Sequence, residues 1–146
     1  MANPVAIAAA IHNADTGDVF VVRRPDDPGE DFAGMWGLPA ATLGDGESVA
    51  EAIQRLGRDK LGIELEAGNE LTRGQQPRDG GALEMILVEA MPRSWPPALT
   101  TPREGSGVTH YTAWDWGAPG ALRPTADQGS LCSRLYLDLA TGETRD

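Results

Sequence analysis

Residues 48–61 carry the strongest pattern in this chain of 146 residues, because their apolar positions recur with the period of an α-helix. Ser48 stands before the pattern as an N-cap residue, and Glu51 follows three positions later, as in a capping box. Gly62 ends the pattern, as glycine commonly does after the last helical turn. The apolar face consists of Val49, Ala52, Ile53 and Leu56. The sequence therefore predicts a helix whose inner face belongs to the core.

The N-terminal region predicts two strands. Residues 5–11 and 19–22 are continuous apolar runs, and the segment between them, residues 13–18, is rich in residues that tolerate tight turns. This arrangement predicts a β-hairpin. Residues 25–34 are polar and rich in Pro and Gly, which predicts a loop.

The C-terminal half predicts further strands and a second helix. Strands are expected at residues 64–72 and 82–91, joined by residues 74–81, and a last strand at 109–116. Residues 93–107 contain several prolines and predict a long irregular loop. A closing helix is expected at 128–139, with Leu131, Leu135 and Leu139 on one face. Strands mixed with helices indicate an α+β or α/β sandwich in one domain, residues 1–146.

The segment before the first helix, taken together with that helix, resembles a known family. It reads Trp36-Gly37-Leu38-Pro39-Ala40-Ala41, and a Gly46-Glu47 pair follows. The resemblance is to the Nudix hydrolase family, whose pattern is a Gly, five residues, a Glu, seven residues, and then Arg-Glu-apolar-any-Glu-Glu-any-Gly-apolar. The pattern fits without a gap, and the positions that agree are Glu47, Arg55, Gly62 and Ile63.

Several positions depart from the family pattern. Ala41 stands where the family has Gly, and Asp59 is a shortened version of the first Glu of the pair. Leu56, Gly57 and Lys60 do not match. The resemblance implies the Nudix fold, an α+β architecture in which a mixed β-sheet is sandwiched between α-helices.

The resemblance also implies a chemistry. Members hydrolyse a nucleoside diphosphate linked to another group, and glutamates of the helix hold Mg²⁺, which bridges the diphosphate and activates water. Carried over to this chain, Glu47 and Asp59 would be metal ligands, and Arg55 would orient Glu47. Glu104, in the long loop, would be a general base, and Arg23 and Arg24, at the end of the second strand, would face the substrate.

The metal site is the weak part of this expectation. Positions 56, 59 and 60 are neighbours on a helix, so three carboxylates there would point at one metal ion. This chain has Leu56, Asp59 and Lys60 at these positions. Leu56 removes a ligand, and the positive charge of Lys60 repels each positive charge of a nearby cation by roughly 4 kcal/mol at an effective dielectric constant of about 20. We expect Mg²⁺ binding to be weak or absent, although Asp45 and Glu51 could help Glu47 and Asp59 to form a rearranged site.

Most of the candidate residues also have a structural interpretation. Leu56 extends the apolar face of the helix, and Arg55 has ordinary i,i+4 partners in Glu51 and Asp59. Lys60 fits either a surface lysine or a fixed cation near a substrate phosphate. Trp36 fits either the core or an aromatic face for a base, whereas Trp114 and Trp116 are expected in the core or at its rim.

Composition limits the classes of partner. The net charge of −10, from 12 cationic and 22 acidic residues, argues against binding to a nucleic acid polymer, because phosphate neutralisation needs a basic face. A small nucleotide or diphosphate compound needs only a local pair of cations. Neither a membrane span nor a secretory signal is evident, so the expected location is the cytoplasm. The lone Cys132 cannot form an internal disulfide.

Three functions stay open at this point. The first is a nucleotide pyrophosphohydrolase with an impaired metal site. The second is a catalytically silent nucleotide-binding or diphosphate-binding module with a regulatory role. The third, least favoured, is a structural domain that binds a protein partner. The oligomeric state is also open, and a homodimer is among the alternatives.

Overall fold

A computed structural model describes residues 4–26, 32–78, 80–99 and 111–141. In chain order the elements are β1 (Val5–Ala10), β2 (Val19–Arg23), β3 (Trp36–Gly37), β4 (Ala40–Thr42), α1 (Val49–Leu56), the π-helical turn η1 (Gly57–Leu61), β5 (Leu65–Arg78), β6 (Gly81–Pro92), β7 (Ala113–Gly117), the 3₁₀-helix η2 (Pro119–Leu122), α2 (Arg123–Asp127) and α3 (Leu131–Thr141).

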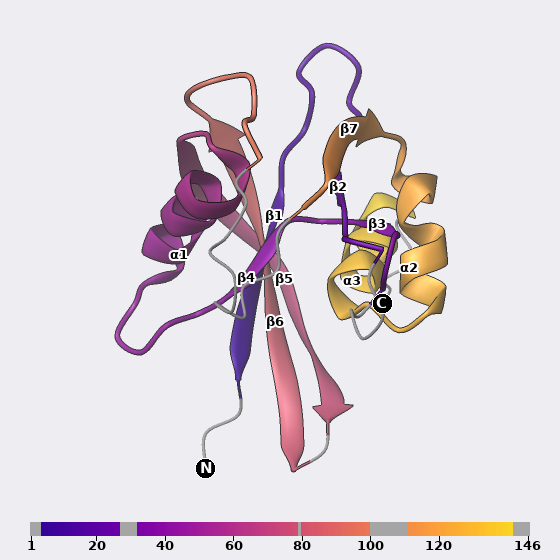
Figure 1. Cartoon of the computed structure of the whole chain (residues 1–146). Helices are drawn as coiled ribbons and strands as arrows, with labels where there is room; N and C mark the ends of the chain where they lie inside the picture. The colour runs from indigo at the N-terminus through magenta and orange to yellow at the C-terminus, as the bar shows by residue number, and fades with distance from the viewer. Residues whose placement is uncertain (1–3, 27–31, 79, 100–110, 142–146) are drawn as a thin grey trace.

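The strands form two sheets. The larger sheet has the order β4-β1-β6-β5, with β1 and β6 parallel and the outer pairs antiparallel. The smaller sheet has the order β3-β2-β7 and is antiparallel throughout. Helix α1 covers one side of the larger sheet, and α2 and α3 lie on the other side (Figure 1). This confirms the predicted α+β fold with a mixed sheet between helices.

Strand β1 separates two hydrophobic cores. The first core, beside α1, contains Ile7, Phe20, Ile53 and Leu56 among its members. The second core, beside α2 and α3, contains Ala8, Val21, Leu122 and Leu137 among others. Successive residues of a strand point to opposite faces, so a continuous apolar run is the expected sequence for a strand that is buried on both sides.

The predicted hairpin at residues 5–22 is only partly correct. Its turn forms, with the Asn13 N–H donating to the Asp18 carbonyl at 2.8 Å, but a single bridge between His12 and Val19 pairs the two runs. Beyond this bridge β1 enters the larger sheet and β2 the smaller one. The physical reason is burial: each run is apolar on both faces and needs a sheet of its own around it.

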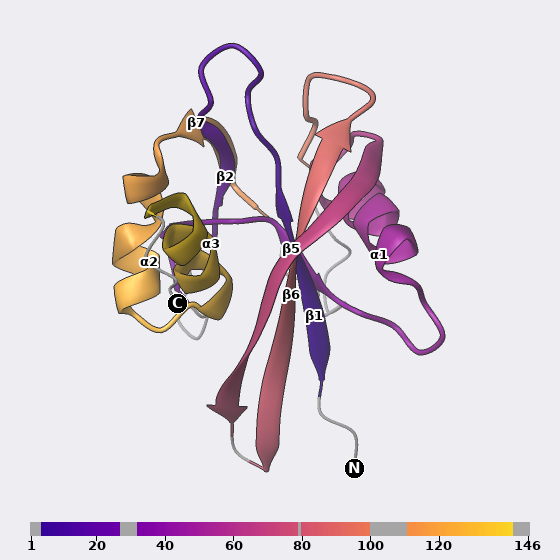
Figure 2. The same ribbon diagram turned by 180° about the vertical axis from the view of Figure 1, so that it is seen from behind.

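Strand β5 is longer than predicted. Residues 74–78, expected to join two strands, continue β5 and pair with β6 from Gly74 opposite Met85 to Arg78 opposite Gly81. Because β5 is an edge strand, it tolerates Pro77, which cannot donate to a ladder. The long β5–β6 pair extends well past the helices, as Figure 2 shows from behind.

The C-terminal helix begins later than predicted. Residues 119–127 form η2 and α2, which the sequence did not indicate, and Gly129, with φ of 107°, separates them from α3. Of the three leucines predicted on one face, Leu131 is buried and Leu135 packs against the second core, whereas Leu139 is 39% exposed. Tyr136 and Leu137 complete the buried face of α3. Cys132 is buried on the same helix and is a free thiol.

The helix predicted at 48–61 forms as α1 followed by η1. Ile53 and Leu56 are buried as expected, and Val49 packs against the first core. Gly62 ends the helix in the left-handed conformation, with φ of 69°. Within the described ranges, no helix has the length and apolar character needed to cross a membrane.

Candidate functional site

The start of α1 is fixed by the predicted capping box. The Glu51 backbone N–H donates to the Ser48 hydroxyl at 3.1 Å, and the Ser48 N–H donates to the Glu51 carboxylate at 2.9 Å. Both bonds satisfy backbone groups that the first turn of a helix leaves without partners. The box fixes the position of the loop before the helix, which carries Glu47.

Glu47 and Arg55 clamp this loop to the helix. Arg55 Nε donates to Glu47 Oε2 and Arg55 Nη2 to Glu47 Oε1, both at 2.9 Å, and Nη2 also donates to the Thr42 carbonyl at 2.7 Å. The Gly44 N–H donates to Glu47 Oε1 at 2.9 Å. Such bidentate, charge-assisted pairs are among the stronger polar contacts in proteins.

This clamp keeps Glu47 ionised. The hydrogen bonds from Arg55 and from the Gly44 N–H lower the pKa of Glu47 from 4.5 to about 2, and the same contact raises the pKa of Arg55. At neutral pH both carboxylate oxygens therefore accept bonds from a guanidinium. The arrangement suits an anchor for the loop, and a metal ion at Glu47 would have to share its oxygens with Arg55.

Position 56 belongs to the hydrophobic core. Its side chain is 1% exposed and packs in the first core with Ile53 and Leu61. Gly57 follows it without a side chain, and a Cβ there would lie 2.7 Å from the Ile63 carbonyl oxygen. Where the family pattern has a Glu and then an apolar residue, this chain has an apolar residue and then a glycine. Leu56 thus supplies the apolar volume, and Gly57 allows the close approach of the chain at Ile63.

Asp59 and Lys60 occupy the remaining two positions. Asp59 is exposed. Lys60 is half-buried, and its Nζ donates to the Ala40 carbonyl at 2.9 Å and lies 5.5 Å from the centre of the Tyr111 ring. The Tyr111 hydroxyl also accepts from the Ala40 N–H at 3.0 Å. The ammonium group is therefore held against the backbone of β4 rather than extended into solvent.

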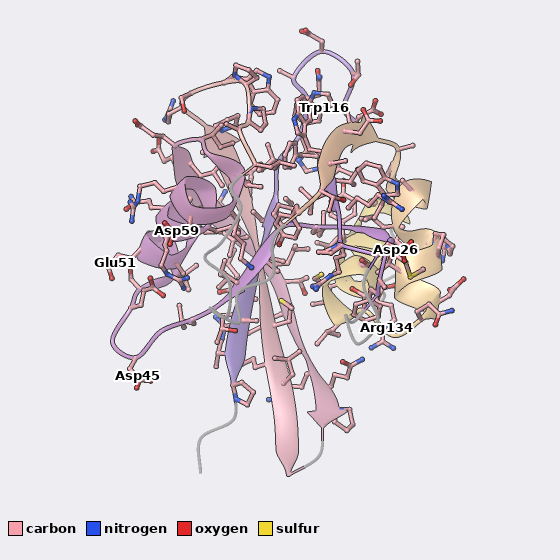
Figure 3. The ribbon with its side chains drawn as sticks, in the orientation of Figure 1. Asp26, Asp45, Glu51, Asp59, Trp116 and Arg134 are labelled. Carbon is pink, nitrogen blue, oxygen red and sulfur yellow. The ribbon has the colours of Figure 1, made fainter. Side chains whose placement is uncertain are left out.

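These residues do not fit a divalent metal site of the family kind. Of the three positions, one supplies a carboxylate, one a buried leucine and one an ammonium group. Among the residues that the structure describes, no three His, Cys, Asp or Glu side chains are grouped so that they could hold a metal ion. Asp45, Glu51 and Asp59 lie at separate places along the loop and the helix (Figure 3).

Arg23, Arg24 and Trp36 are grouped at the end of β2. Arg23 pairs in register with Trp36, and its Nε donates to the Gly34 carbonyl at 3.0 Å. Trp36 packs against the second core. The Arg24 guanidinium lies 5.7 Å from the centre of the Phe32 ring. Lys60 lies elsewhere, at the Ala40 carbonyl of β4 and beside the Tyr111 ring. Substrate contacts from these three residues stay predictions.

Glu104, the predicted general base, lies outside the described residues, so its role also stays a prediction. Trp114 and Trp116 pack against the first core, as expected for core or rim residues. They form one aromatic cluster with Phe20 and Trp95, in which Trp95 and Trp116 stack with ring centres 5.5 Å apart.

Tyr111 is the site residue that the sequence did not indicate. It is 3% exposed and binds the backbone of Ala40, 71 positions away in the chain. A lone tyrosine beside a loop has no periodicity that would point to such a distant partner. Only the packing of the two sheets brings Tyr111, Ala40 and Lys60 together.

The comparisons with known proteins place these features in context. The NUDIX domain family matches residues 2–126. A search of curated proteins gave no match. Among solved structures, the chain is similar to the MutT protein of Methanosarcina mazei Go1, with 16% identity, a TM-score of 0.72, and coverage of 100% of this chain and 99% of that one.

Two further structures are similar. The E. coli ORF135 protein has 23% identity and a TM-score of 0.68, with coverage of 100% of this chain and 96% of that one. The NUDIX domain of Shewanella oneidensis NrtR, solved in complex with ADP ribose, has 16% identity and a TM-score of 0.63, with coverage of 98% and 89%. At these identities the likeness concerns the fold.

Proposed function

Because this chain belongs to the NUDIX domain family, we propose that it binds a small nucleoside diphosphate compound and that it does so without a divalent metal ion. The binding face is formed by the end of the first helix, Ala40 and Tyr111. Ligand binding, rather than hydrolysis, is the function that this face supports best. The solved NrtR domain, similar in fold, carries ADP ribose, which makes that compound a suitable first probe.

The observation that carries this proposal is the Lys60 ammonium at the Ala40 carbonyl. A divalent ion about 4 Å from this ammonium would meet a repulsion of roughly 8 kcal/mol at an effective dielectric constant of about 20, twice the value for a unit charge. At the same distance and dielectric constant the carboxylate of Asp59 would cancel this repulsion, but Asp59 is exposed, so water screens its charge more than that of the half-buried Lys60. The balance favours an anionic ligand at this face over a metal cation.

A second candidate is metal-dependent hydrolysis of a nucleoside diphosphate linked to another group. The intact Glu47–Arg55 pair favours it, since both residues of this pair agree with the family pattern. An open cavity of about 390 Å³ lies beside the pair, with Asp45, Glu51 and Gln54 in its lining. In this alternative Glu47 and Asp59 would be the residual metal ligands and Glu104 the general base.

The ligand we propose is a small molecule, because the net charge of −10 opposes long polyanions. We also propose a cytoplasmic location, which the single free Cys132 fits.

A thermal-shift panel tests the proposal. ADP, ADP-ribose and UDP-glucose are added in EDTA and in Mg²⁺, and product release is followed in the same samples. A ligand at 100 times its Kd stabilises a protein by about 2.7 kcal/mol, which raises Tm by roughly 5–10 °C in a domain of this size. We expect equal shifts with and without metal, and no product.

Two other results would overturn the proposal. Stabilisation that needs Mg²⁺, together with product release, would establish the hydrolase. No stabilisation by any compound under either condition would remove both candidates.

A further inference from the structure

Lys60 stands at a position where the family pattern has a metal-binding glutamate, and its ammonium group is held at the Ala40 carbonyl. We propose that its ammonium group is a tethered cation that takes the place of the divalent metal in holding the diphosphate, so that Lys60→Glu alone converts ligand binding from metal-independent to metal-dependent. This inference rests on the proposed function and adds to it the group that carries the affinity.

Among the described residues, three features hold the ammonium in place. The first is the backbone of η1, which carries Lys60 and ends at Gly62 in the left-handed conformation. This end is packed closely against Ala98, because a Cβ on Gly62 would lie 2.2 Å from the Ala98 carbonyl oxygen. The second is the hydrogen bond of 2.9 Å to the Ala40 carbonyl, and the third is the Tyr111 ring at 5.5 Å. An aromatic face attracts a cation.

The Ala40 carbonyl is itself well fixed. Ala40 pairs with Ala8 of the central strand β1, and the Tyr111 hydroxyl contacts both its N–H, at 3.0 Å, and its carbonyl, at 3.3 Å. A backbone carbonyl oxygen is also a ligand that hard divalent cations accept. The ammonium thus binds an oxygen of the chemical kind that a metal ion would use.

This geometry differs from that of a solvated surface lysine. A lysine in water loses rotamer freedom when it binds a phosphate, and a side chain that is already held loses less. Because an ammonium has three N–H donors, the bond to the Ala40 carbonyl uses only one of them. The half-buried setting also lowers the local dielectric constant, which strengthens its attraction for an anion.

The neighbouring residue makes the inference testable by a gain of function. Asp59 is exposed and directly precedes Lys60. With Lys60→Glu, two adjacent carboxylates and the Ala40 carbonyl would present oxygen ligands, the set that Mg²⁺ prefers. The substitution changes the local charge by two units, from repelling a metal ion to attracting one.

The experiment is a calorimetric titration of ADP-ribose and of inorganic pyrophosphate into wild type and four variants, each in EDTA and in Mg²⁺. Lys60→Met removes the charge, Lys60→Gln keeps an N–H donor for Ala40 without the charge, and Lys60→Glu reverses it. Arg134→Met is the control, because Arg134 is an exposed cation on α3, on the other side of the larger sheet. Melting temperatures without ligand show that each variant is folded.

We expect wild type and Arg134→Met to bind equally in both buffers. Lys60→Met and Lys60→Gln should bind about 10- to 100-fold more weakly, the range for a hydrogen bond to a charged group. Lys60→Glu should lose binding in EDTA and recover it in Mg²⁺.

Three results would count against this inference. Binding by wild type in EDTA with unchanged affinity in Lys60→Met and Lys60→Gln would refute the role of Lys60 and leave the proposed function intact. Failure of Lys60→Glu to recover binding in Mg²⁺ would refute the exchange of cation for metal. Absence of binding by wild type in EDTA would refute both the proposed function and this inference.

Discussion

Replacing Leu56 by the glutamate of the family pattern should destabilise the protein rather than restore a metal site. The Leu56 side chain is 1% exposed and lies in the first core with Ile53 and Leu61. A carboxylate there would lose its hydration without gaining an ion-pair partner. The direction of the effect therefore follows from burial and does not depend on the ligand.

The magnitude can be worked from two contributions. Exchanging buried methyl groups for a polar end costs about 2 kcal/mol, the low end of the range for large-to-small core substitutions. Burial raises the pKa of such a carboxyl, and a rise of about 3 units costs roughly 3 kcal/mol at neutral pH. The sum of about 5 kcal/mol corresponds to a fall in Tm of roughly 10–20 °C.

The pH dependence gives a second signature. For an acid whose folded-state pKa is raised above its unfolded value, stability is full at low pH and is lost as pH rises through the folded pKa. The cost of Leu56→Glu should therefore be smaller near about pH 5 than near about pH 8.

The assay is chemical or thermal unfolding of Leu56→Glu at both pH values, with and without Mg²⁺. Gln54→Glu, an exposed site on the same helix, is the matched control and should change stability by less than about 0.5 kcal/mol. A Leu56→Glu protein as stable as wild type and further stabilised by Mg²⁺ would refute the reasoning, because it would mean that position 56 can turn toward a metal ion.

Three further outcomes are expected. The pKa of Glu47 is lowered to about 2, so its contribution to stability is present above the unfolded value of 4.5 and is lost as pH falls toward about 2. Glu47→Gln should therefore make the stability of the protein less dependent on pH in this window. A Glu47 carboxyl that titrates near 4.5 by NMR would contradict the clamp. Gly57→Ala should lower Tm despite the better helix propensity of alanine, because the new Cβ would meet the Ile63 carbonyl at 2.7 Å, and an unchanged or higher Tm would refute the close approach. Tyr111→Phe should cost about 1–2 kcal/mol in denaturant unfolding through the lost contacts with Ala40, and a cost near zero would show that these contacts carry no stability.

The fold could be predicted where local signals and tertiary packing agree. The capping box at Ser48, the apolar period and Gly62 all point to one helix, and the helix forms with these limits. For the two N-terminal apolar runs, local signals and tertiary packing disagree. The local sequence is compatible with a hairpin, but in the folded protein the two runs belong to different sheets.

The candidate site could be predicted in its chemistry but not in its contacts. The ungapped pattern identified Leu56 and Lys60 as residues that differ from the family pattern, and helix geometry predicted that they are neighbours on the helix. Neither the complete burial of Leu56 nor the bond from Lys60 to Ala40 follows from spacing along the chain. Tyr111 was missed for the same reason, since its partner lies 71 positions away.

Metal affinity tests the central claim most directly. Mg²⁺ and Mn²⁺ are titrated calorimetrically into the wild-type protein at neutral pH, because the account assigns the metal position to the ammonium of Lys60. The account predicts no measurable heat of specific binding, or a dissociation constant in the millimolar range or weaker. A dissociation constant in the micromolar range or tighter would contradict it, and would show that carboxylates of this chain assemble a metal site despite Leu56 and Lys60.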